Sequence, residues 1–324
     1  MCTAINFKTK STYFGRTFDY DFSYNEKVII TPRNYEFIFK NKKIINNHYA
    51  LIGMGIVIDN YPLYYDCINE KGLGIAGLNF VNNAVYFNNN PTKENIASYE
   101  LIPYILCQCQ NIKEVKKLLK RINITKESFD EKLKYSQLHW LISDLSGQSI
   151  VVESTIEGLK IYDNKVGVLT NNPPFNYQLF NLNNYMKISA NDPKNSFSSK
   201  ISLNTYSRGL GGIGLPGDLS SMSRFVRATF TKFNSICNDD ESSSVTQFFH
   251  ILNSVFQQNG CCKVNDEYEK TIYTSCCNLN EGIYYYTTYN NSQINAINMF
   301  HTNYLDSKLI VYSLNNKQNI NFIN

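Results

Sequence analysis

The chain opens with two strand-forming runs that are close enough in sequence to pair with each other. Residues 3–7 and 12–18 are rich in β-branched and aromatic side chains, and a short polar segment separates them. This pattern predicts a β-hairpin, in which late residues of the second strand lie opposite early residues of the first. The hairpin therefore places Arg16 or Asp19 near Cys2.

Cys2 directly follows Met1, and its small side chain permits removal of that methionine. The new N-terminus would carry a thiol that titrates near pH ~8.5 and an α-amine that titrates near pH ~7.7–8.0. A nucleophile and a base would then share one residue. A cation near the thiol would lower the thiol pKa, and a carboxylate could orient the amine. From these residues alone two alternatives stay open: Cys2 as an arbitrary second residue, and Arg16 with Asp19 as a strand-end ion pair.

Composition excludes several classes of function. The chain has 324 residues, of which 43% are hydrophobic, enough for a sizeable core. Its net charge is +4, and its 31 Lys and Arg residues are scattered, so no nucleic-acid partner is expected. We find no apolar signal segment and no stretch approaching about 18 apolar residues, so no membrane association is expected. These features predict a cytoplasmic protein.

The nine cysteines and four histidines do not form a metal-binding pattern. No Cys-x2-Cys is matched by a second such motif or by closely spaced histidines, which stand at positions 48, 139, 250 and 301. We interpret Cys107 and Cys109 as helix residues and most other cysteines as small buried hydrophobes. His139 lies in a predicted strand and is interpreted as structural. No metal and no cofactor are expected.

Apolar residues at helical spacing predict helices at residues 98–109, 112–122, 176–185, 221–236 and 245–257. Serines at 220 or 221 and at 243 or 244 are the expected N-caps of the last two helices.

Strand-like runs fill the rest of the chain. They cover residues 27–31, 49–58, 72–80, 138–142, 149–154, 159–162, 166–170, 271–277, 282–289, 293–299 and 309–314. The block at 138–170 predicts a further sheet. Because strand-rich and helix-rich blocks alternate without a linker, we predict helices packed on sheets in one domain, residues 1–324.

Seven motifs in a fixed order resemble a known family. They are Met-Cys-Thr at 1–3, Phe-Gly-Arg-x-x-Asp at 14–19, Asn-Glu-Lys-Gly-Leu at 69–73, Gly-Leu-Asn at 77–79, Leu-Thr-Asn-Asn-Pro at 169–173, Gly-Leu-Pro-Gly-Asp at 214–218 and Ser-Arg-Phe at 223–225. Together they resemble the choloylglycine hydrolase family, which comprises bile salt hydrolases and penicillin V acylases within the N-terminal nucleophile hydrolases. The resemblance runs from residue 1 to about residue 315.

This resemblance implies an α+β fold of four layers, αββα, and a cofactor-free amidase that acts through an N-terminal cysteine. It also implies a homotetramer. Each catalytic position of the family is matched here: Cys2 corresponds to the nucleophile, Arg16 and Asp19 to the pair that tunes the thiol and the amine, Asn79 and Asn171 to the oxyanion site, and Arg224 to the remaining active-site arginine.

The substrate class depends on the pocket. A steroid or phenoxy acyl group needs an apolar, partly aromatic wall, and the residues that resemble the family's wall are Phe18, Tyr20, Tyr24, Tyr65, Phe129 and Leu133. Each of these can equally be a core residue. Bile salt hydrolases tend to have Asn, and penicillin V acylases Tyr, at the position of Asn79, which favours bile salts.

Conjugated bile salts end in an anion, so an arginine near the leaving amine is expected. Arg208, which lies just before the Gly-Leu-Pro-Gly-Asp motif, can supply it and would favour taurine conjugates; alternatively it is a solvated loop residue. We therefore predict hydrolysis of conjugated bile salts, amphipathic small molecules, to bile acid plus taurine or glycine. The alternatives are a penicillin V acylase, a non-catalytic steroid-binding protein and a structural assembly subunit.

Overall fold

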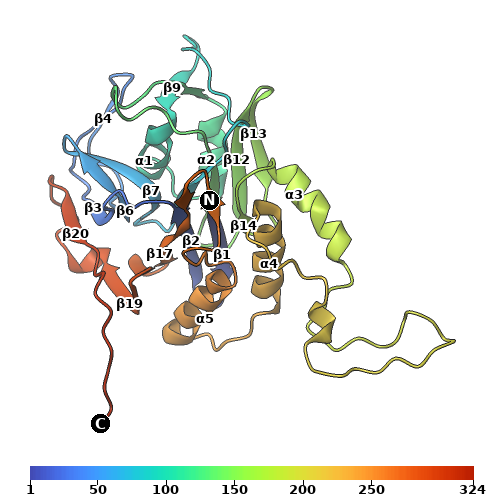
Figure 1. The fold of residues 1–324 in the computed structure, drawn as a ribbon. Helices are drawn as coiled ribbons and strands as arrows, with labels where there is room; N and C mark the ends of the chain where they lie inside the picture. Colours follow the sequence, from blue (N-terminus) through green and yellow to red (C-terminus); the bar gives the residue numbers. More distant parts are fainter.

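Two antiparallel β-sheets lie face to face in the computed structural model, which covers residues 1–324 (Figure 1). The first sheet contains the N-terminal hairpin near its middle. Its six strands are, in spatial order, β14 (Val168–Leu169), β1 (Cys2–Lys8), β2 (Thr12–Tyr20), β17 (Lys270–Asn278), β18 (Ile283–Thr288) and β19 (Asn291–Asn298). The hairpin predicted from the sequence is thus confirmed, and it shares one sheet with strands from residues 270–298.

The second sheet has eight strands. In spatial order they are β13 (Gly158–Asp163), β12 (Ser149–Thr155), β11 (Leu138–Ser143), β8 (Gly74–Asn79), β7 (Tyr61–Asn69), β6 (Leu51–Ile58), β3 (Lys27–Thr31) and β20 (Ile310–Ser313). The prediction of a further sheet for residues 138–170 is wrong. Strand β11 pairs with β8 and so extends this same sheet, whereas β14 joins the other sheet beside β1.

Helices cover the outer face of each sheet. The helices α1 (Leu101–Leu106) and α2 (Ile112–Leu119) pack on the eight-stranded sheet, and α4 (Ser221–Asn234) and α5 (Glu241–Asn253) pack on the six-stranded sheet. Helix α3 (Phe175–Asn181) lies beside α4 (Figure 1). The predicted four-layer αββα arrangement is confirmed.

Several helix boundaries differ from the sequence-based expectation: α2 ends at Leu119 rather than at residue 122, and α5 covers Glu241–Asn253 rather than residues 245–257. The N-cap of α4 is Ser220, as predicted, but that of α5 is Asp240, whose carboxylate accepts the backbone N–H of Ser243. The first predicted helix is divided into a 3₁₀ turn, Ser98–Glu100, and α1, which ends at Leu106. The prediction that Cys107 and Cys109 are helix residues is therefore wrong. Glu100 closes that turn by accepting the backbone N–H of Ala97.

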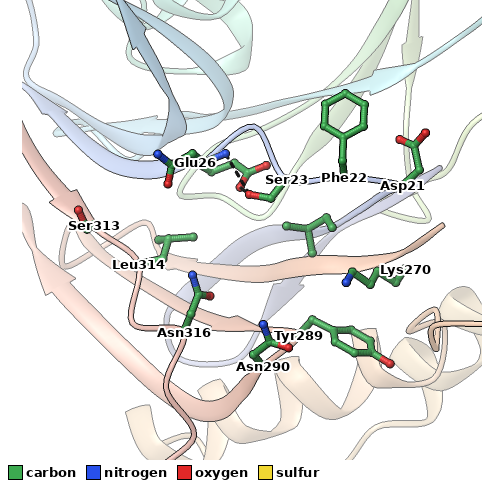
Figure 2. A pocket seen from close by; sticks show the side chains of 12 residues that line it. Asp21, Phe22, Ser23, Glu26, Lys270, Tyr289, Asn290, Ser313, Leu314 and Asn316 are labelled. Atoms are coloured by element: carbon green, nitrogen blue, oxygen red, sulfur yellow. Dashed lines mark hydrogen bonds between the residues drawn. The ribbon is translucent and has the colours of Figure 1, made fainter. Parts of the chain in front are cut away.

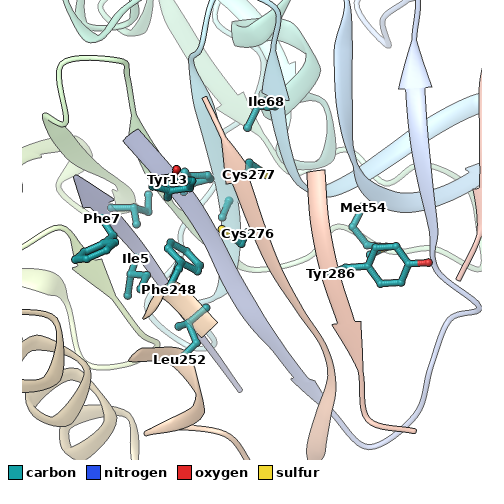
Figure 3. Close-up of a cluster of buried hydrophobic side chains, with 14 of the residues drawn as sticks. Ile5, Phe7, Tyr13, Met54, Ile68, Phe248, Leu252, Cys276, Cys277 and Tyr286 are labelled. Atoms are coloured by element: carbon teal, nitrogen blue, oxygen red, sulfur yellow. The ribbon is translucent and has the colours of Figure 1, made fainter. Parts of the chain in front are cut away.

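Apolar side chains fill the space between the sheets and beneath the helices. Figure 3 shows Met54 and Ile68 of the eight-stranded sheet and, in the same cluster, Cys276 and Cys277 of β17. Phe248 contributes to the cluster from α5. The prediction that most cysteines are small buried hydrophobes holds for these two; Cys261 is exposed.

The remaining regular elements are short. They are β4 (Phe37–Ile38), β5 (Ile44–Ile45), β9 (Glu94–Ala97), β10 (Ile122–Thr125), β15 (Lys263–Val264), β16 (Glu267–Tyr268) and three more 3₁₀ turns, Leu182–Tyr185, Leu210–Gly212 and Met299–His301. A long loop before Leu210 projects from the body of the protein (Figure 1). None of the helices combines the length and apolarity needed to cross a bilayer.

Candidate active site

The register of the N-terminal hairpin sets the position of Cys2. Cys2 pairs with Phe18, and Ala4 pairs with Arg16, so all four side chains share one face of the six-stranded sheet. This face is turned toward the eight-stranded sheet, because Nη1 of Arg16 donates to the carbonyls of Tyr65 in β7 and Gly77 in β8. The Cys2 thiol and the Arg16 guanidinium therefore occupy the space between the sheets, and both residues are at most 3% exposed.

On the opposite face of the hairpin, Asp19 meets Arg224 of helix α4. The Asp19 carboxylate accepts hydrogen bonds from the hydroxyls of Thr17 (3.0 Å) and Thr271 (2.7 Å). Nη1 of Arg224 lies 4.0 Å from Oδ2 of Asp19 and 2.7 Å from the hydroxyl of Thr3. The two arginines predicted for the site thus flank the N-terminal strand from its two sides.

The main chain of Cys2 is held by Arg224 and Asn171. The N–H of Cys2 donates to Oδ1 of Asn171 at 2.8 Å, and Nη1 of Arg224 donates to the carbonyl of Cys2. The Asn171 amide group in turn donates to the carbonyl of Asn79 at 2.8 Å. Both polar atoms of the Asn171 side chain therefore make hydrogen bonds within the protein.

Asn79 lines the cavity that contains Cys2, and its hydrogen bond with Asn171 uses the backbone carbonyl, which leaves the side-chain amide available as a donor. Of the two asparagines predicted for the oxyanion site, Asn79 is the one with a free donor. Asn171 instead holds the backbone nitrogen of Cys2 through its side-chain oxygen.

Burial and neighbouring charges act differently on the two arginines. Burial alone lowers the Arg16 pKa, but the charges of Cys2, Tyr273, Asp66 and Asp19 outweigh it and raise that pKa above its ordinary value. Burial lowers the pKa of Arg224, and the charges of Asp19 and Cys2 only partly oppose this. Both guanidiniums are completely desolvated, so each acts on its neighbours in a medium that screens charge weakly.

The cavity above Cys2 has a volume of about 110 Å³. Its wall is formed by Cys2, Arg16, Phe18, Asp19, Tyr20, Tyr24, Tyr64, Tyr65, Gly77, Asn79, Ser136 and Leu138. All the predicted catalytic residues except Asn171 and Arg224 line it directly, and those two contact Cys2 from behind.

Aromatic rings form a continuous wall from the floor of this cavity to the protein surface. The ring of Phe18 stacks on Tyr65 at 4.9 Å, and Tyr24 lies 5.6 Å from Tyr20. Phe22, which is 50% exposed, packs 4.7 Å from Tyr24 and lines a neighbouring cavity. The wall thus offers a broad apolar surface that begins beside the thiol and ends in solvent.

Three of the predicted substrate-binding residues lie elsewhere. Phe129 packs between Tyr61 and Tyr99, at ring distances of 5.8 and 5.4 Å, and does not line the cavity. Leu133 lies in the same loop, where its carbonyl accepts the N–H of Phe129. Arg208 is exposed on the projecting loop and lies outside the cavity of its own chain.

Met1 precedes Cys2 in this structure, so the Cys2 nitrogen is an amide. The α-amine of Met1 donates to the carbonyl of Asp19 at 2.6 Å and to Oε2 of Glu269 at 3.1 Å. Glu269 follows the small hairpin β15–β16, which approaches the N-terminus from the C-terminal half of the chain. No sequence motif indicated this contact.

His139 supports the site from behind, as its structural interpretation predicts. Its ring stacks on Phe80 at 4.3 Å, while its nitrogens contact Glu153 (3.0 Å) and the carbonyl of Thr170 (2.8 Å). Gln178 holds the next carbonyl, that of Asn171. These contacts fix the turn that carries Asn171, and none reaches the cavity.

A second cavity, of about 180 Å³, shares the loop of residues 21–26 with the first (Figure 2). Glu26 closes this loop by accepting hydrogen bonds from the hydroxyl of Ser23 and the N–H of Tyr24. Lys270 and Asn316 contribute to the far wall. The cavity contains neither Cys2 nor any other residue predicted to be catalytic.

Comparison with known proteins agrees with this geometry. Residues 2–313 match the family model of linear amide C–N hydrolases, choloylglycine hydrolase family. A bile salt hydrolase/transferase from Lactiplantibacillus plantarum is 56% identical over 97% of both chains. The structure superposes on a crystal structure of a mutant conjugated bile acid hydrolase from Clostridium perfringens with a TM-score of 0.93, 41% identity and full coverage of both chains.

A penicillin V acylase from Agrobacterium tumefaciens shares the fold, with a TM-score of 0.75 at 18% identity over 96% of this chain and 91% of that one. The order of the sheets and helices, the position of Cys2 at the head of β1 and the family match therefore lead to one assignment: the chain belongs to the choloylglycine hydrolase family of linear amide C–N hydrolases.

Proposed function

We propose that this chain hydrolyses the amide bond of conjugated bile salts and releases free bile acid together with taurine or glycine. The proposal rests on one arrangement: the Cys2 thiol lies at the floor of an aromatic-walled cavity, beside an arginine and the free amide of Asn79. It is supported by the 56% identity to a protein named bile salt hydrolase/transferase.

Loss of Met1 creates the reactive residue. The nitrogen of Cys2 becomes an α-amine that can still donate to Oδ1 of Asn171, as the amide N–H does now. The amine accepts the thiol proton, and the guanidinium of Arg16 favours the resulting thiolate. Asp19 and Arg224 hold the strand end from the other side.

Acylation begins with attack of the thiolate on the amide carbonyl of the substrate. A carbon–sulfur bond forms, and the carbonyl oxygen becomes an oxyanion that the Asn79 amide stabilises. The protonated α-amine then gives its proton to the departing nitrogen, so the carbon–nitrogen bond breaks and taurine or glycine leaves. The bile acid remains bound to Cys2 as a thioester.

Deacylation uses the same groups in reverse. The free α-amine removes a proton from water, whose oxygen attacks the thioester, and the thiol is regenerated as the bile acid leaves. An amine in place of water would give a new amide. This transferase reaction is the second function that we propose, because the relative from L. plantarum is named for both activities.

The aromatic wall suits the acyl group of a bile salt. A steroid skeleton needs an extended apolar surface, and the series Phe18, Tyr65, Tyr20, Tyr24 and Phe22 provides one that reaches solvent. Penicillin V, with its smaller phenoxyacetyl group, is the alternative substrate that this site could accept by the same chemistry.

We further propose that tauro-conjugates are preferred and that Arg208 binds the sulfonate. A guanidinium presents several donors in a fixed fork, which suits an anion with three acceptor oxygens. Arg208 lies outside the cavity of its own chain, so this role requires a neighbouring subunit to present the loop. A homotetramer, which we also propose, could do so. The loop carries large exposed apolar side chains, including Phe197 (82%) and Tyr206 (84%), that suit such a contact.

The preference can be tested by replacing Ser207, Arg208 and Gly209 with Gly-Thr-Gly. Wild-type protein should hydrolyse taurocholate about 10–200-fold faster than glycocholate in kcat/KM, and the replacement should narrow or reverse that ratio. Sedimentation velocity on both proteins reports whether assembly changes. If the variant assembles as the wild type does and its ratio of kcat/KM for taurocholate to glycocholate is unchanged, Arg208 does not determine the preference between the two conjugates.

The main proposal is tested on Cys2 itself. Intact mass should show loss of Met1, and Cys2→Ala should remove turnover of taurocholate, glycocholate and penicillin V while leaving the melting temperature close to that of wild type. Substantial hydrolysis by Cys2→Ala, or full activity in a chain that retains Met1, would contradict the mechanism. Faster release from penicillin V than from either bile salt would favour the acylase alternative.

A further inference from the structure

Arg16 is a buried cation without a direct ionic partner. Its Nε donates to the carbonyl of Thr17 at 3.2 Å and its Nη1 to the carbonyls of Tyr65 and Gly77, whereas no carboxylate oxygen lies within 4.0 Å. Carbonyl dipoles compensate a full charge only in part, so burying such a cation is costly. A counter-charge somewhat farther away is therefore needed.

Asp66, on the neighbouring strand β7, has the features of that counter-charge. It is completely buried, and its carboxylate accepts three hydroxyl hydrogen bonds from the opposite sheet: from Tyr273 (2.6 Å), Ser275 (2.9 Å) and Tyr284 (2.6 Å). Three donors and no acceptor surround the two oxygens, which is the environment of an ionised carboxylate. None of these residues belongs to the amide-cleaving machinery described above.

Two short links connect Asp66 to Arg16. The hydroxyl of Ser275 accepts the backbone N–H of Arg16 at 3.2 Å and donates its own proton to Asp66. The carbonyl of Tyr65, the residue before Asp66, accepts from the Arg16 guanidinium. In the six-stranded sheet, Arg16 on β2 stands between Cys2 on β1 and the tyrosines on β17 and β18 that hold Asp66. Arg16 is thus placed between the thiol on one side and the carboxylate on the other.

We propose that Asp66 is a positioning residue that acts through Arg16: its negative charge holds the guanidinium and limits how strongly Arg16 stabilises the Cys2 thiolate. The inference rests on the proposed role of Cys2 as nucleophile. Asp66 does not contact the substrate cavity. Asp66 changes the pKa of the Cys2 thiol indirectly, because its negative charge offsets part of the positive charge of Arg16.

The charges around the pair agree with this arrangement. Burial raises the pKa of Asp66 above its ordinary value, and Arg16 together with the hydroxyls of Tyr273 and Tyr284 opposes this rise only in part. The other titratable groups that face Asp66 are the thiols of Cys67 and Cys277, and burial raises the pKa of both well above the ordinary value. Those thiols are therefore neutral near pH 7 and add no charge beside Asp66. Arg16 is the cation whose charge acts on Asp66.

The test is the Asp66→Asn substitution in the full chain after loss of Met1. Removing the carboxylate charge leaves more of the Arg16 charge to stabilise the thiolate, so the pKa of the Cys2 thiol should fall by about one unit. A thiolate of lower basicity is a weaker nucleophile, so its alkylation rate at high pH should fall about threefold. A purely structural role predicts a lower melting temperature without this shift.

The readout is the rate of alkylation by iodoacetamide between pH 5 and 10, quantified by mass spectrometry on the N-terminal peptide so that other cysteines do not contribute. Glu100→Gln is the matched control, because Glu100 is an equally buried carboxylate, 1% exposed, that interacts with the backbone of Lys40 and Ala97 rather than with Arg16. This control should leave the thiol pKa unchanged.

If Asp66→Asn does not fold, Tyr273→Phe decides. It removes the only donor to Oδ1 of Asp66, which raises the pKa of that carboxyl and favours its neutral form, so the thiol pKa should also fall, by a smaller amount. An unchanged or raised thiol pKa in the folded variant overturns the proposal. The assay needs no substrate: a shifted Cys2 profile in a protein that cleaves no amide would refute the proposed function and leave the role of Asp66 standing.

Discussion

Asn171 accepts two hydrogen bonds on one oxygen, from the Cys2 nitrogen and from Nη2 of Arg224, each at 2.8 Å. The same arginine reaches the Cys2 carbonyl. Arg224 and Asn171 therefore hold the main chain of the first residues, while Arg16 approaches from the side of the thiol. The two arginines are alike in burial but have different partners.

This difference predicts different pH behaviour. Arg16→Gln should raise the thiol pKa by about one unit or more, because it removes the cation that faces the thiolate. Arg224→Gln should lower kcat with a smaller shift, because its main loss is the support of the Cys2 carbonyl and of Asn171. Profiles of kcat/KM against pH for both variants check this expectation. Equal shifts, or a change in KM alone, would contradict the assignment.

Asn79→Ala should lower kcat by about 10²–10³-fold with little change in KM, since the amide donor is needed for the oxyanion rather than for the bound substrate. The hydrogen bond from Asn171 goes to the backbone carbonyl of Asn79, which the substitution keeps, so the melting temperature should barely change. Asn171→Ala is the comparison: it breaks three hydrogen bonds and should lower both activity and stability.

Tyr24→Ala should raise KM for taurocholate more than it lowers kcat, because Tyr24 belongs to the aromatic wall and is remote from the reacting bond. Phe129→Ala is the matched control, since Phe129 packs against Tyr61 and Tyr99 outside the cavity. It should lower the melting temperature and leave KM close to that of wild type. If Phe129→Ala raised KM more than Tyr24→Ala does, Phe129 would have to contact the substrate.

Glu100 should make stability depend on pH in an unusual direction. Burial raises its pKa to about 7 from 4.5, so the folded state holds the proton more tightly than the unfolded chain. The stabilisation that protonated Glu100 provides is fully present below its pKa in the unfolded chain. It is lost as pH rises through its pKa in the folded state. A shift of this size corresponds to about 3 kcal/mol at most. Urea unfolding between pH 4.5 and 8 should show this loss in wild type and not in Glu100→Gln.

The local features of the fold could be predicted from the sequence. The hairpin and its approximate register follow from two strand-forming runs joined by a short polar segment, which is why Arg16 and Asp19 were expected near Cys2. Strand β7 was not predicted, because Pro62 and Asp66 interrupt its apolar pattern. Asp66 is compatible with the buried strand because three hydroxyls from the other sheet satisfy it.

Contacts between distant segments could not be predicted. Thr271 binds Asp19 across 252 residues because β17 pairs with β2, and nothing in either strand specifies that partner. For the same reason the strands at 138–170 were assigned to a further sheet. A sequence pattern can predict that a segment forms a strand, but it does not identify the strand with which that segment pairs. The positions of Phe129 and Leu133 depend on a loop path that has no periodicity.

The pairing of β2 with β17 has a consequence for the order of events during synthesis. The sheet around the N-terminal strand closes only after residues 270–278 have left the ribosome, whereas Met1 emerges first. At about 5–20 residues per second, translation from Tyr20 to Lys270 takes on the order of 10–50 s. Throughout that time Glu269 does not yet exist to bind the amine of Met1. We therefore expect Met1 to be removed from the nascent chain, before Glu269 and strand β17 can enclose the N-terminus.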